Sequence, residues 1–256
     1  MQRLAFALAF LFTAALLVSP ARATVMYDGS LATAPGSQGW LYVTVPLVGA
    51  LATESVSGGA VTLDSTPDGN ERAGYFNTVY PSTPVLDRAT GFTVQFTMRL
   101  RSEEHQSADR AGFSLIALSN DKKGLELAFW MNEVWAQNDS NSGPAYAYFT
   151  HGEGASLDAN AGLIQYDLAV HGSTYWVLAG GAQILTGTVR DYTGYTGTLD
   201  PYETPNFLFF GDDTGSASAR TEISRFEVLN YATPEPASLL LLAVGALGLF
   251  RRRARH

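Results

Sequence analysis

The sequence predicts an all-β protein, a sandwich of two antiparallel sheets, with a hydrophobic segment at each end of the chain. Three observations indicate this fold class. Apolar and polar residues alternate with a period of two along most of the chain. Clusters of Gly, Pro, Asn and Asp separate the alternating runs. No convincing 3.6-residue period occurs between the two ends, and about ten short strands of this kind are typical of two packed sheets.

The N-terminal segment, residues 1–23, has the three parts of a secretory signal peptide. A basic residue, Arg3, precedes an apolar run over 4–18, and the small-residue site Ala21-Arg22-Ala23 follows it. We therefore expect a signal helix that signal peptidase removes after Ala23. The body of the protein, residues 24–232, is then predicted to lie outside the cytoplasm.

The clearest strand prediction covers residues 92–100. Apolar side chains occupy every second position from Phe92 to Leu100, and polar ones such as Gln95 lie between them, as a half-buried strand requires. A run that is apolar on both faces, 113–118, predicts a central strand. Further strands are predicted at 40–45, 60–63, 125–132, 166–170, 175–178, 182–185, 207–210 and 222–231.

Two local irregularities are also predicted. Gly180-Gly181 lies between two strand candidates and allows positive φ angles without steric cost, which is typical of a hairpin turn. In the last strand, the alternate positions that hold apolar residues change from odd to even numbers between Ile223 and Phe226. An extra residue in the strand produces such a shift, so we expect a β-bulge there.

The C-terminal segment, residues 233–256, combines three features in order. Thr233-Pro234-Glu235-Pro236 comes first, an apolar run of 14 residues follows over 237–250, and an arginine-rich tail ends the chain. A permanent membrane helix needs about 20 apolar residues, so this short helix predicts transient insertion in the inner membrane. The arginines favour a cytoplasmic position for the tail.

This combination resembles the PEP-CTERM sorting signal. The resemblance rests on Pro234, Glu235 and Pro236 and on the basic residues Arg251, Arg252 and Arg253. It implies processing by an exosortase, a membrane-embedded cysteine transpeptidase, in a Gram-negative bacterium. The precursor is then tethered to the inner membrane, and the mature protein reaches the cell surface or the extracellular matrix. The alternative is a plain membrane anchor with an accidental Pro-Glu-Pro.

The body is acidic and contains no cysteine. Residues 24–232 hold ten Lys and Arg against 23 Asp and Glu, a formal charge of −13. Such a field repels phosphate backbones, so nucleic-acid binding is disfavoured. Without cysteine, neither a disulfide nor a thiolate nucleophile is available.

The body also resembles concanavalin A-like lectin/glucanase domains of jelly-roll type, and among them the choice-of-anchor Y domain. The resemblance is carried by residues 27–31, 110–130, 133–139 and 206–219. It implies a two-sheet sandwich placed ahead of a sorting tail, with no defined activity. The matching segments are typical of the fold rather than of a catalytic site.

No catalytic constellation is recognisable in the sequence. Glycosidases on this fold place paired carboxylates on one face of a strand, whereas Glu126 and Glu133 are separated by an odd number of residues and point to opposite faces of a regular strand. Glu103 and Glu104 are adjacent and are predicted to lie in a loop. We therefore expect a non-catalytic protein. The alternative is a secreted polysaccharide-active enzyme with a carboxylate pair that the sequence does not reveal.

Calcium is the one cofactor that the sequence suggests. Asp212 and Asp213 directly follow a predicted strand, and carboxylate oxygens at such loop positions bind hard cations. Asp is also an ordinary turn former, because its side chain accepts hydrogen bonds from nearby backbone amides. Both interpretations stay open at this point.

Candidate glycan contacts are Trp130, Trp135, Asn138 and Asp139, since sugars bind flat apolar rings together with planar hydrogen-bonding groups. The alternative is that both tryptophans are half-buried sheet residues. A tyrosine-rich segment, 192–197, is predicted to pack over the edge of the sandwich. The expected role is therefore a displayed surface or matrix protein with weak contact to exopolysaccharide.

Overall fold

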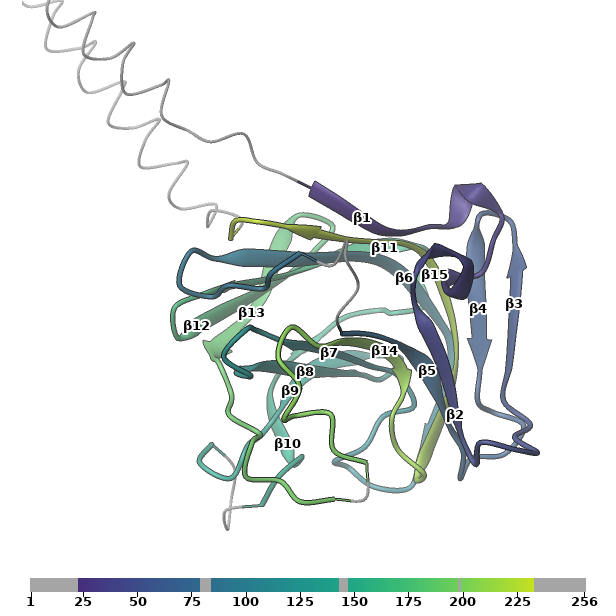
Figure 1. Ribbon diagram of the computed structural model, residues 1–256. Coiled ribbons are helices and arrows are strands. Elements are labelled where there is room, and N and C mark those ends of the chain that lie inside the picture. Colours follow the sequence, from purple (N-terminus) through teal and green to yellow (C-terminus); the bar gives the residue numbers. More distant parts are fainter. Residues whose placement is uncertain (1–22, 79–83, 143–146, 198, 233–256) are drawn as a thin grey trace, which may run out of the picture.

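The computed structural model describes residues 23–78, 84–142, 147–197 and 199–232. It confirms an all-β fold of two stacked antiparallel sheets (Figure 1). Short 3₁₀ turns, η1 (Gly29–Leu31) and η2 (Pro35–Gln38), are the helical elements within these ranges. None of the helices in the described ranges has the length and apolarity to cross a membrane. The predicted signal helix and C-terminal helix lie outside the described residues.

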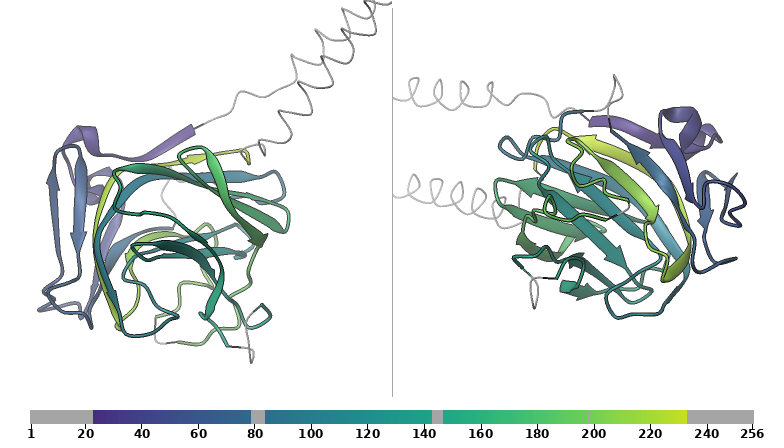
Figure 2. Two further views of the ribbon diagram at one scale, coloured as in Figure 1. Left: turned by 180° about the vertical axis from the view of Figure 1, so that it is seen from behind. Right: turned by 60° about the horizontal axis from the view of Figure 1, so that its bottom comes forward.

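Among the described residues the larger sheet has the strand order β13-β12-β11-β6-β15-β4-β3, and β1 pairs with β15 beside β4. Its strands are β1 (Ala23–Asp28), β3 (Thr53–Ser57), β4 (Ala60–Asp64), β6 (Phe92–His105), β11 (Ile164–His171), β12 (Thr174–Ala179), β13 (Ala182–Thr188) and β15 (Ala217–Leu229). The two central strands, β6 and β15, come from the middle and from the end of the body and pair with each other. Figure 2 shows this sheet arching over the smaller one.

The smaller sheet has the order β10-β9-β8-β7-β14-β5-β2. Its strands are β2 (Leu41–Val45), β5 (Arg72–Asn77), β7 (Ser114–Leu118), β8 (Gly124–Phe129), β9 (Glu133–Gln137), β10 (His151–Ser156) and β14 (Leu208–Asp212). Its inner face packs on the larger sheet. Long loops follow β9 and β13 and lie over its outer face (Figure 1).

Aromatic side chains hold the two sheets together at the centre of the core. Trp40 contacts Phe210 of β14 at a ring-centroid distance of 4.8 Å and Phe226 of β15 at 4.9 Å, both edge to face. Its indole nitrogen donates a hydrogen bond of 2.9 Å to the carbonyl oxygen of Met26. Trp40 therefore bridges the sheets and has its polar atom satisfied, as a buried tryptophan requires.

The predicted hairpin and bulge are both present. Gly180 and Gly181, with φ angles of 57° and 81°, form the turn between β12 and β13. The register between β15 and β6 shifts between Ile223 and Arg225, within the interval where the apolar parity changes.

Several strands were not predicted, and one loop prediction is wrong. Strands β3, β5 and β10 are short and rich in Gly or polar residues, so their alternation is weak, and β1 is a short segment in which apolar and polar residues do not alternate. Glu103 and Glu104 belong to β6 rather than to a loop, because β15 pairs with β6 as far as His105. Pairing with a neighbouring strand extends β6 beyond its apolar stretch.

The two ends of the body lie side by side. Ala23, at the start of β1, pairs with Leu229, at the end of β15. Figure 1 shows β1 running beside the end of β15. The segments preceding residue 23 and following residue 232 therefore leave the sandwich from neighbouring positions.

We expect Trp40→Ala to lower the free energy of unfolding by about 3–5 kcal/mol, because a large side chain that contacts both sheets is removed from a closely packed core. Urea denaturation followed by circular dichroism measures the change. Leu41→Ala is the matched control, since this adjacent side chain is 57% exposed. The control is expected to stay within about 0.5 kcal/mol of the wild type. Equal losses in the two variants would contradict the bridging role.

Candidate functional site

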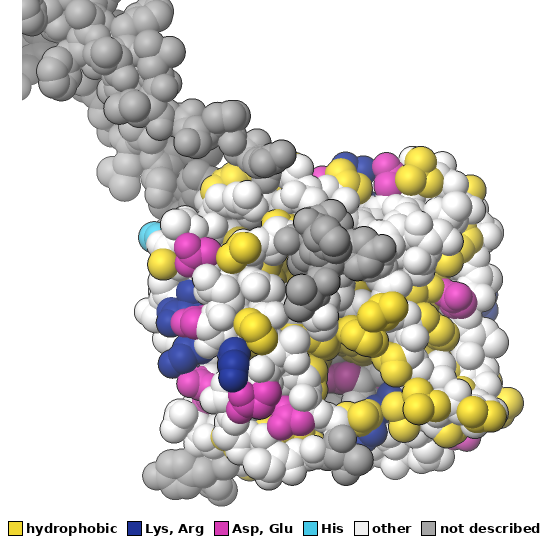
Figure 3. Space-filling view, in the orientation of Figure 1, with side chains coloured by type: hydrophobic (Ala, Val, Ile, Leu, Met, Phe, Trp, Pro, Cys, Tyr) yellow, Lys and Arg dark blue, Asp and Glu magenta, His cyan; other side chains and the backbone are white. Residues whose placement is uncertain are grey.

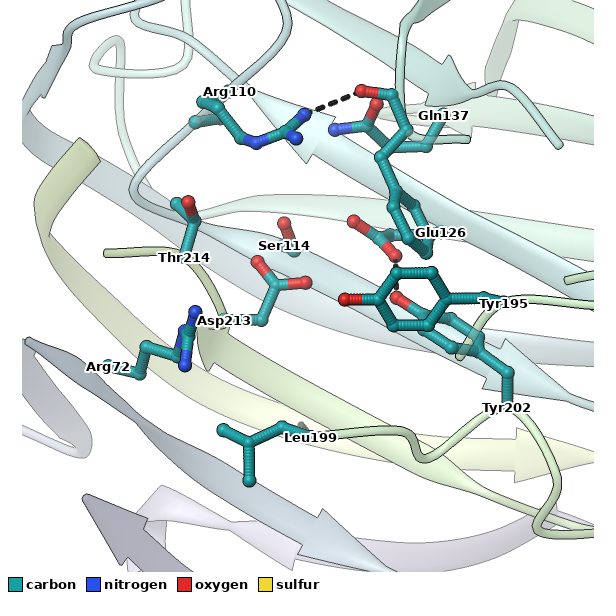
Figure 4. Close-up of a pocket in the computed structure, with 12 residues that line it drawn as sticks. Arg72, Arg110, Ser114, Glu126, Gln137, Tyr195, Leu199, Tyr202, Asp213 and Thr214 are labelled. Carbon is teal, nitrogen blue, oxygen red and sulfur yellow. Dashed lines mark hydrogen bonds between the residues drawn. The ribbon is translucent and has the colours of Figure 1, made fainter. Parts of the chain in front are cut away.

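A polar cavity of about 380 Å³ opens on the outer face of the smaller sheet. Figure 3 shows this hollow, with an acidic group at its bottom and basic groups beside it. Strands β5, β7, β8 and β9 supply its floor and the long loops supply its wall. The lining residues drawn in Figure 4 include Arg72, Arg110, Ser114, Glu126, Gln137, Tyr195, Leu199, Tyr202, Asp213 and Thr214.

Strand alternation places the two acidic residues of this cavity. In β8, Leu125 and Leu127 belong to the core between the sheets, so Glu126 projects from the opposite face. At the end of β14, Phe210 points into the core and Asp213, an odd number of residues later, points outward. Both strands flank β7, which brings their outward side chains over the same part of the sheet.

Glu126 and Asp213 form a hydrogen-bonded carboxyl pair. The Glu126 side chain is only 3% exposed, and burial raises its pKa well above the usual range, as does the neighbouring charge of Asp213. Burial also raises the pKa of Asp213, although its hydrogen bonds with Glu126 and Ser114 act in the opposite direction. Two buried carboxyl groups in contact cannot both ionise at low cost. Burial and the neighbouring charge of Asp213 therefore both favour the neutral form of Glu126.

Further hydrogen bonds orient Glu126. The hydroxyl of Tyr202 donates to its Oε2 atom, as Figure 4 shows. The hydroxyl of Tyr192, a fully buried residue, donates 2.7 Å to the carbonyl oxygen of Gln137 and approaches the amide of Glu126. Burial is the main cause that raises the pKa of both tyrosines well above the usual range. Both phenols are therefore neutral hydrogen-bond donors at physiological pH.

Two arginines and an amide complete the polar end of the cavity. Arg110 donates a hydrogen bond of 2.6 Å to the carbonyl oxygen of Phe149, and this bond fixes its guanidinium at the cavity wall. Arg72 projects from β5 toward Asp213 (Figure 4). Gln137 projects from β9 and donates to the carbonyl oxygen of Asp109 at 3.3 Å. Cations, neutral donors and acceptors thus surround the acidic pair.

An apolar pocket of about 270 Å³ adjoins the polar cavity. The two spaces share the lining residues Arg72, Leu199, Tyr202 and Asp213. The apolar part lies over β2, β5 and β14 and is lined by side chains such as Val43, Phe76, Ile116, Phe207 and Phe209. We refer to the two spaces together as the cleft, which crosses the outer face of the smaller sheet.

The tyrosine-rich segment packs over the sandwich, as predicted. Tyr192 is fully buried, and Tyr195 contacts Phe149 edge to face at 4.9 Å. Tyr202 contacts Phe149 at 5.1 Å, so aromatic rings join the two loops that border the cleft. This contact holds the cleft wall in place without a disulfide.

Asp212 and Asp213, the predicted calcium ligands, do not converge on one position. Asp212 is buried and accepts a hydrogen bond of 2.6 Å from the hydroxyl of Ser65. Burial raises its pKa to about 9. It is therefore protonated at neutral pH, whereas a cation needs the anionic form. Asp213 points to the other side, toward Glu126. Nowhere in the described ranges do three His, Asp or Glu side chains gather as metal ligands. The calcium role of Asp212 and Asp213 stays a prediction.

The four predicted glycan contacts lie close together but are mostly buried. Trp135 is fully buried against His151 at a ring distance of 4.3 Å, and Asn138 is hydrogen-bonded to Thr150. Asp139 accepts hydrogen bonds from its own loop and from the amide of Asp191. These three side chains organise the sheet and the loop, and they leave no surface for a sugar.

Trp130 is the partly exposed member of this group. Its ring stacks on His105 at 4.2 Å, and its indole nitrogen donates 2.8 Å to the carbonyl oxygen of Arg110. It projects from the outer face of the smaller sheet, as the alternation predicts, but it does not line the cleft. Its glycan role stays a prediction.

Sequence reasoning missed the pairing of Glu126 with Asp213. It compared Glu126 with Glu133, which instead contacts His151 at 3.1 Å. The partner of Glu126 comes from a distant strand that β7 brings alongside. The sequence did contain a signal: Leu125 and Leu127 on either side of Glu126 indicate that its side chain faces outward, and counting on from Phe210 gives the same direction for Asp213.

Residues 232–254 match the PEP-CTERM protein-sorting motif, which confirms the sorting signal predicted at this end. The motif implies an exported protein that an exosortase processes in a Gram-negative bacterium. It covers the tail alone and gives no information about the sandwich. The sequence matched none of the curated proteins with which it was compared.

Solved structures share the architecture at low sequence identity. A carbohydrate esterase from the Shiga toxin-encoding bacteriophage phi24B is 13% identical, with a TM-score of 0.52, and the match covers 82% of this chain and 100% of the esterase chain. Alginate lyase A1-II′ of polysaccharide lyase family 7 is 11% identical, with a TM-score of 0.46, and the match covers 80% of this chain and 92% of the lyase chain. The binding domain of botulinum neurotoxin DC is 11% identical, with a TM-score of 0.45, and the match covers 76% of this chain and 44% of the neurotoxin chain. Of these three, the esterase alone exceeds a TM-score of 0.5, and it supports the sandwich fold.

We expect Asp212→Asn to weaken the pH dependence of stability. The folded-state pKa of Asp212 is raised from 3.8 to about 9, so the folded protein binds a proton that the unfolded chain has released within this range. The wild type therefore loses stability as pH rises from about 4 to about 9, by at most about 1.4 kcal/mol per pH unit from this group. The variant loses this contribution.

Urea unfolding of both proteins at pH 5, 7 and 8.5 measures the effect. The stability of the variant relative to the wild type is expected to increase with pH. Asp158→Asn, at an exposed site, is the control and should leave the slope unchanged. Parallel curves for the wild type and Asp212→Asn would show that Asp212 is not held protonated.

Proposed function

We propose that the sandwich is a non-catalytic carbohydrate-binding domain of an exosortase-processed protein, displayed at the cell surface or in the extracellular matrix. The cleft carries this proposal. It combines an apolar trough with a polar cavity, and it lies on the outer face of a sheet, where a chain-like ligand has access. The sorting motif supports the proposed location.

The cleft has the chemistry that a sugar chain requires. Rings of Tyr195 and Phe149 offer flat apolar surfaces for the C–H faces of a sugar. Gln137, Tyr202 and the arginines offer planar or fixed hydrogen-bonding groups for its hydroxyls. The aromatic contacts between the loops hold these groups in place, so binding costs little ordering entropy.

The carboxyl pair favours binding over glycoside hydrolysis. Retaining glycosidases keep their two carboxyl groups about 5–5.5 Å apart and inverting enzymes about 6.5–9.5 Å apart. Glu126 and Asp213 instead interact with each other, and the charge of Asp213 adds to the raised pKa of Glu126.

The second candidate is a polysaccharide-active enzyme. One observation favours it: burial raises the pKa of Glu126 well above its usual range, as in a general acid, and Glu126 lies in the cleft beside Asp213. This function requires a ligand to separate the two carboxyl groups when it binds.

We expect Tyr195→Ala to weaken binding of the purified mature protein to its glycan by about fivefold to a hundredfold, the range of one lost aromatic contact. A glycan array identifies the ligand and calorimetry measures the affinity. Tyr231→Ala, outside the cleft, is the matched control. Retention of full affinity by Tyr195→Ala would place binding elsewhere, and an absence of any glycan binding would refute the proposal.

The same preparation separates the two candidate functions. Incubation with each bound polysaccharide, followed by a reducing-end assay, is expected to release no product. If product appears and Glu126→Gln abolishes it, the enzyme replaces the binding protein. Glu126→Gln is suited to this test because its amide can still donate to Asp213 and accept from Tyr202.

We expect Glu235→Ala to block removal of the C-terminal segment, because Thr233-Pro234-Glu235-Pro236 loses its charged side chain. Mass spectrometry of the protein from its native host measures both termini and also tests cleavage after Ala23. Ser238→Ala, in the apolar run, controls for a general effect of substitution. Normal processing of Glu235→Ala would exclude this glutamate as a recognition element.

A further inference from the structure

The arginines of the cleft differ from the other cations of the body. All ten Lys and Arg residues of 24–232 lie in the part of the chain that the structure describes. Seven of them pair with a carboxylate, namely Arg88, Arg101, Lys122, Lys123, Arg190, Arg220 and Arg225. The exceptions are Arg72, Arg99 and Arg110. Two of these three line the cleft, in a protein with acidic groups in excess.

Arg72 has no hydrogen-bonding partner for its side chain among the described residues. Its Nε atom is buried without an acceptor. The guanidinium lies where the polar cavity and the apolar pocket meet, and it points toward Asp213 without forming an ion pair (Figure 4). A partly desolvated guanidinium with free donors is costly unless a ligand supplies acceptors.

Gln137 provides a second, independent sign of a ligand. Its side chain is 2% exposed and lines the cavity, and its Oε1 atom accepts no hydrogen bond. Its Nε2 atom donates to the carbonyl oxygen of Asp109, which fixes the amide orientation. A buried acceptor fixed in this way suits a hydroxyl donor from a bound molecule.

The two arginines are the cations of the cleft and lie beside its acidic side chains. Arg72 and Arg110 line the polar cavity together with Glu126 and Asp213, and burial raises the pKa of Glu126 well above its usual range, which favours its neutral form. Asp200 lines the apolar part of the cleft. The surrounding acidic surface repels anions in general, so an anion that binds here needs specific contacts with the cleft.

We propose that the cleft binds an acidic polysaccharide through the carboxylate groups of its uronic acid residues. Arg72 donates in a bidentate arrangement to the two oxygens of one carboxylate, which matches the planar fork of a guanidinium. Gln137 accepts from a ring hydroxyl of the same sugar, and the aromatic wall contacts the ring face. This inference rests on the proposed carbohydrate-binding function and names its ligand class.

The test compares matched polymers. Calorimetry measures binding of the mature protein to polygalacturonate and to alginate oligosaccharides, to the same oligosaccharides with their carboxyl groups chemically reduced to alcohols, and to sulfated dextran. We expect binding to at least one polyuronate and a loss of at least about tenfold after carboxyl reduction. Binding to sulfated dextran that equals or exceeds the polyuronate would assign the site to anions in general and overturn the uronate proposal.

Substitutions locate the contact. Arg72→Gln is expected to weaken polyuronate binding about tenfold or more, and Arg72→Lys to restore it only in part, because lysine keeps the charge but lacks the fork. Arg99→Gln is the matched control. Arg99 also lacks a carboxylate partner, but it lies on the larger sheet and donates to Asn160. Unfolding midpoints of the three variants verify that each is folded.

The outcomes separate this inference from the proposed function. Equal binding to native and carboxyl-reduced oligosaccharides, unaffected by Arg72→Gln, would overturn uronate recognition while leaving carbohydrate binding intact. Equal losses in Arg72→Gln and Arg99→Gln would show a general charge effect and would also overturn it. Failure to bind any glycan, neutral or acidic, would refute both.

Discussion

The packing of the two sheets against each other is the constraint on which the rest of this protein depends. Without disulfides, the sandwich is held by alternating apolar side chains and by aromatic bridges such as Trp40 between Phe210 and Phe226. Because the inner face of each strand is committed to this core, every second residue of the smaller sheet is available on the outside. The cleft consists of those residues, from Arg72 to Gln137, together with the loops that cover them.

Electrostatics in the cleft follow from the same packing. The loops that cover the smaller sheet remove Glu126 from water, and its contact with Asp213 then makes double ionisation too costly. A neutral Glu126 lowers the acidic charge beside Arg72 and Arg110, which leaves the two guanidinium groups better able to attract acceptor groups of a ligand.

The alternation of apolar and polar residues predicted the architecture because it indicates which face of a strand is buried. It identified the strand at 92–100 and the bulge after Ile223. It did not predict β5 or β10, where glycines and polar residues leave no periodic signal. Nor did it predict the Glu126–Asp213 pair, which depends on the order of strands in the sheet. The two residues meet because β7 lies between β8 and β14, and local periodicity contains no information about that order.

The pairing of β1 with β15 brings the two ends of the described body together. Ala23 and Leu229 are cross-strand neighbours, so the chain enters and leaves the sandwich at the same corner. Both strands belong to the larger sheet, whereas the cleft opens on the outer face of the smaller one. The entry and exit of the chain and the cleft are thus assigned to different layers of the fold.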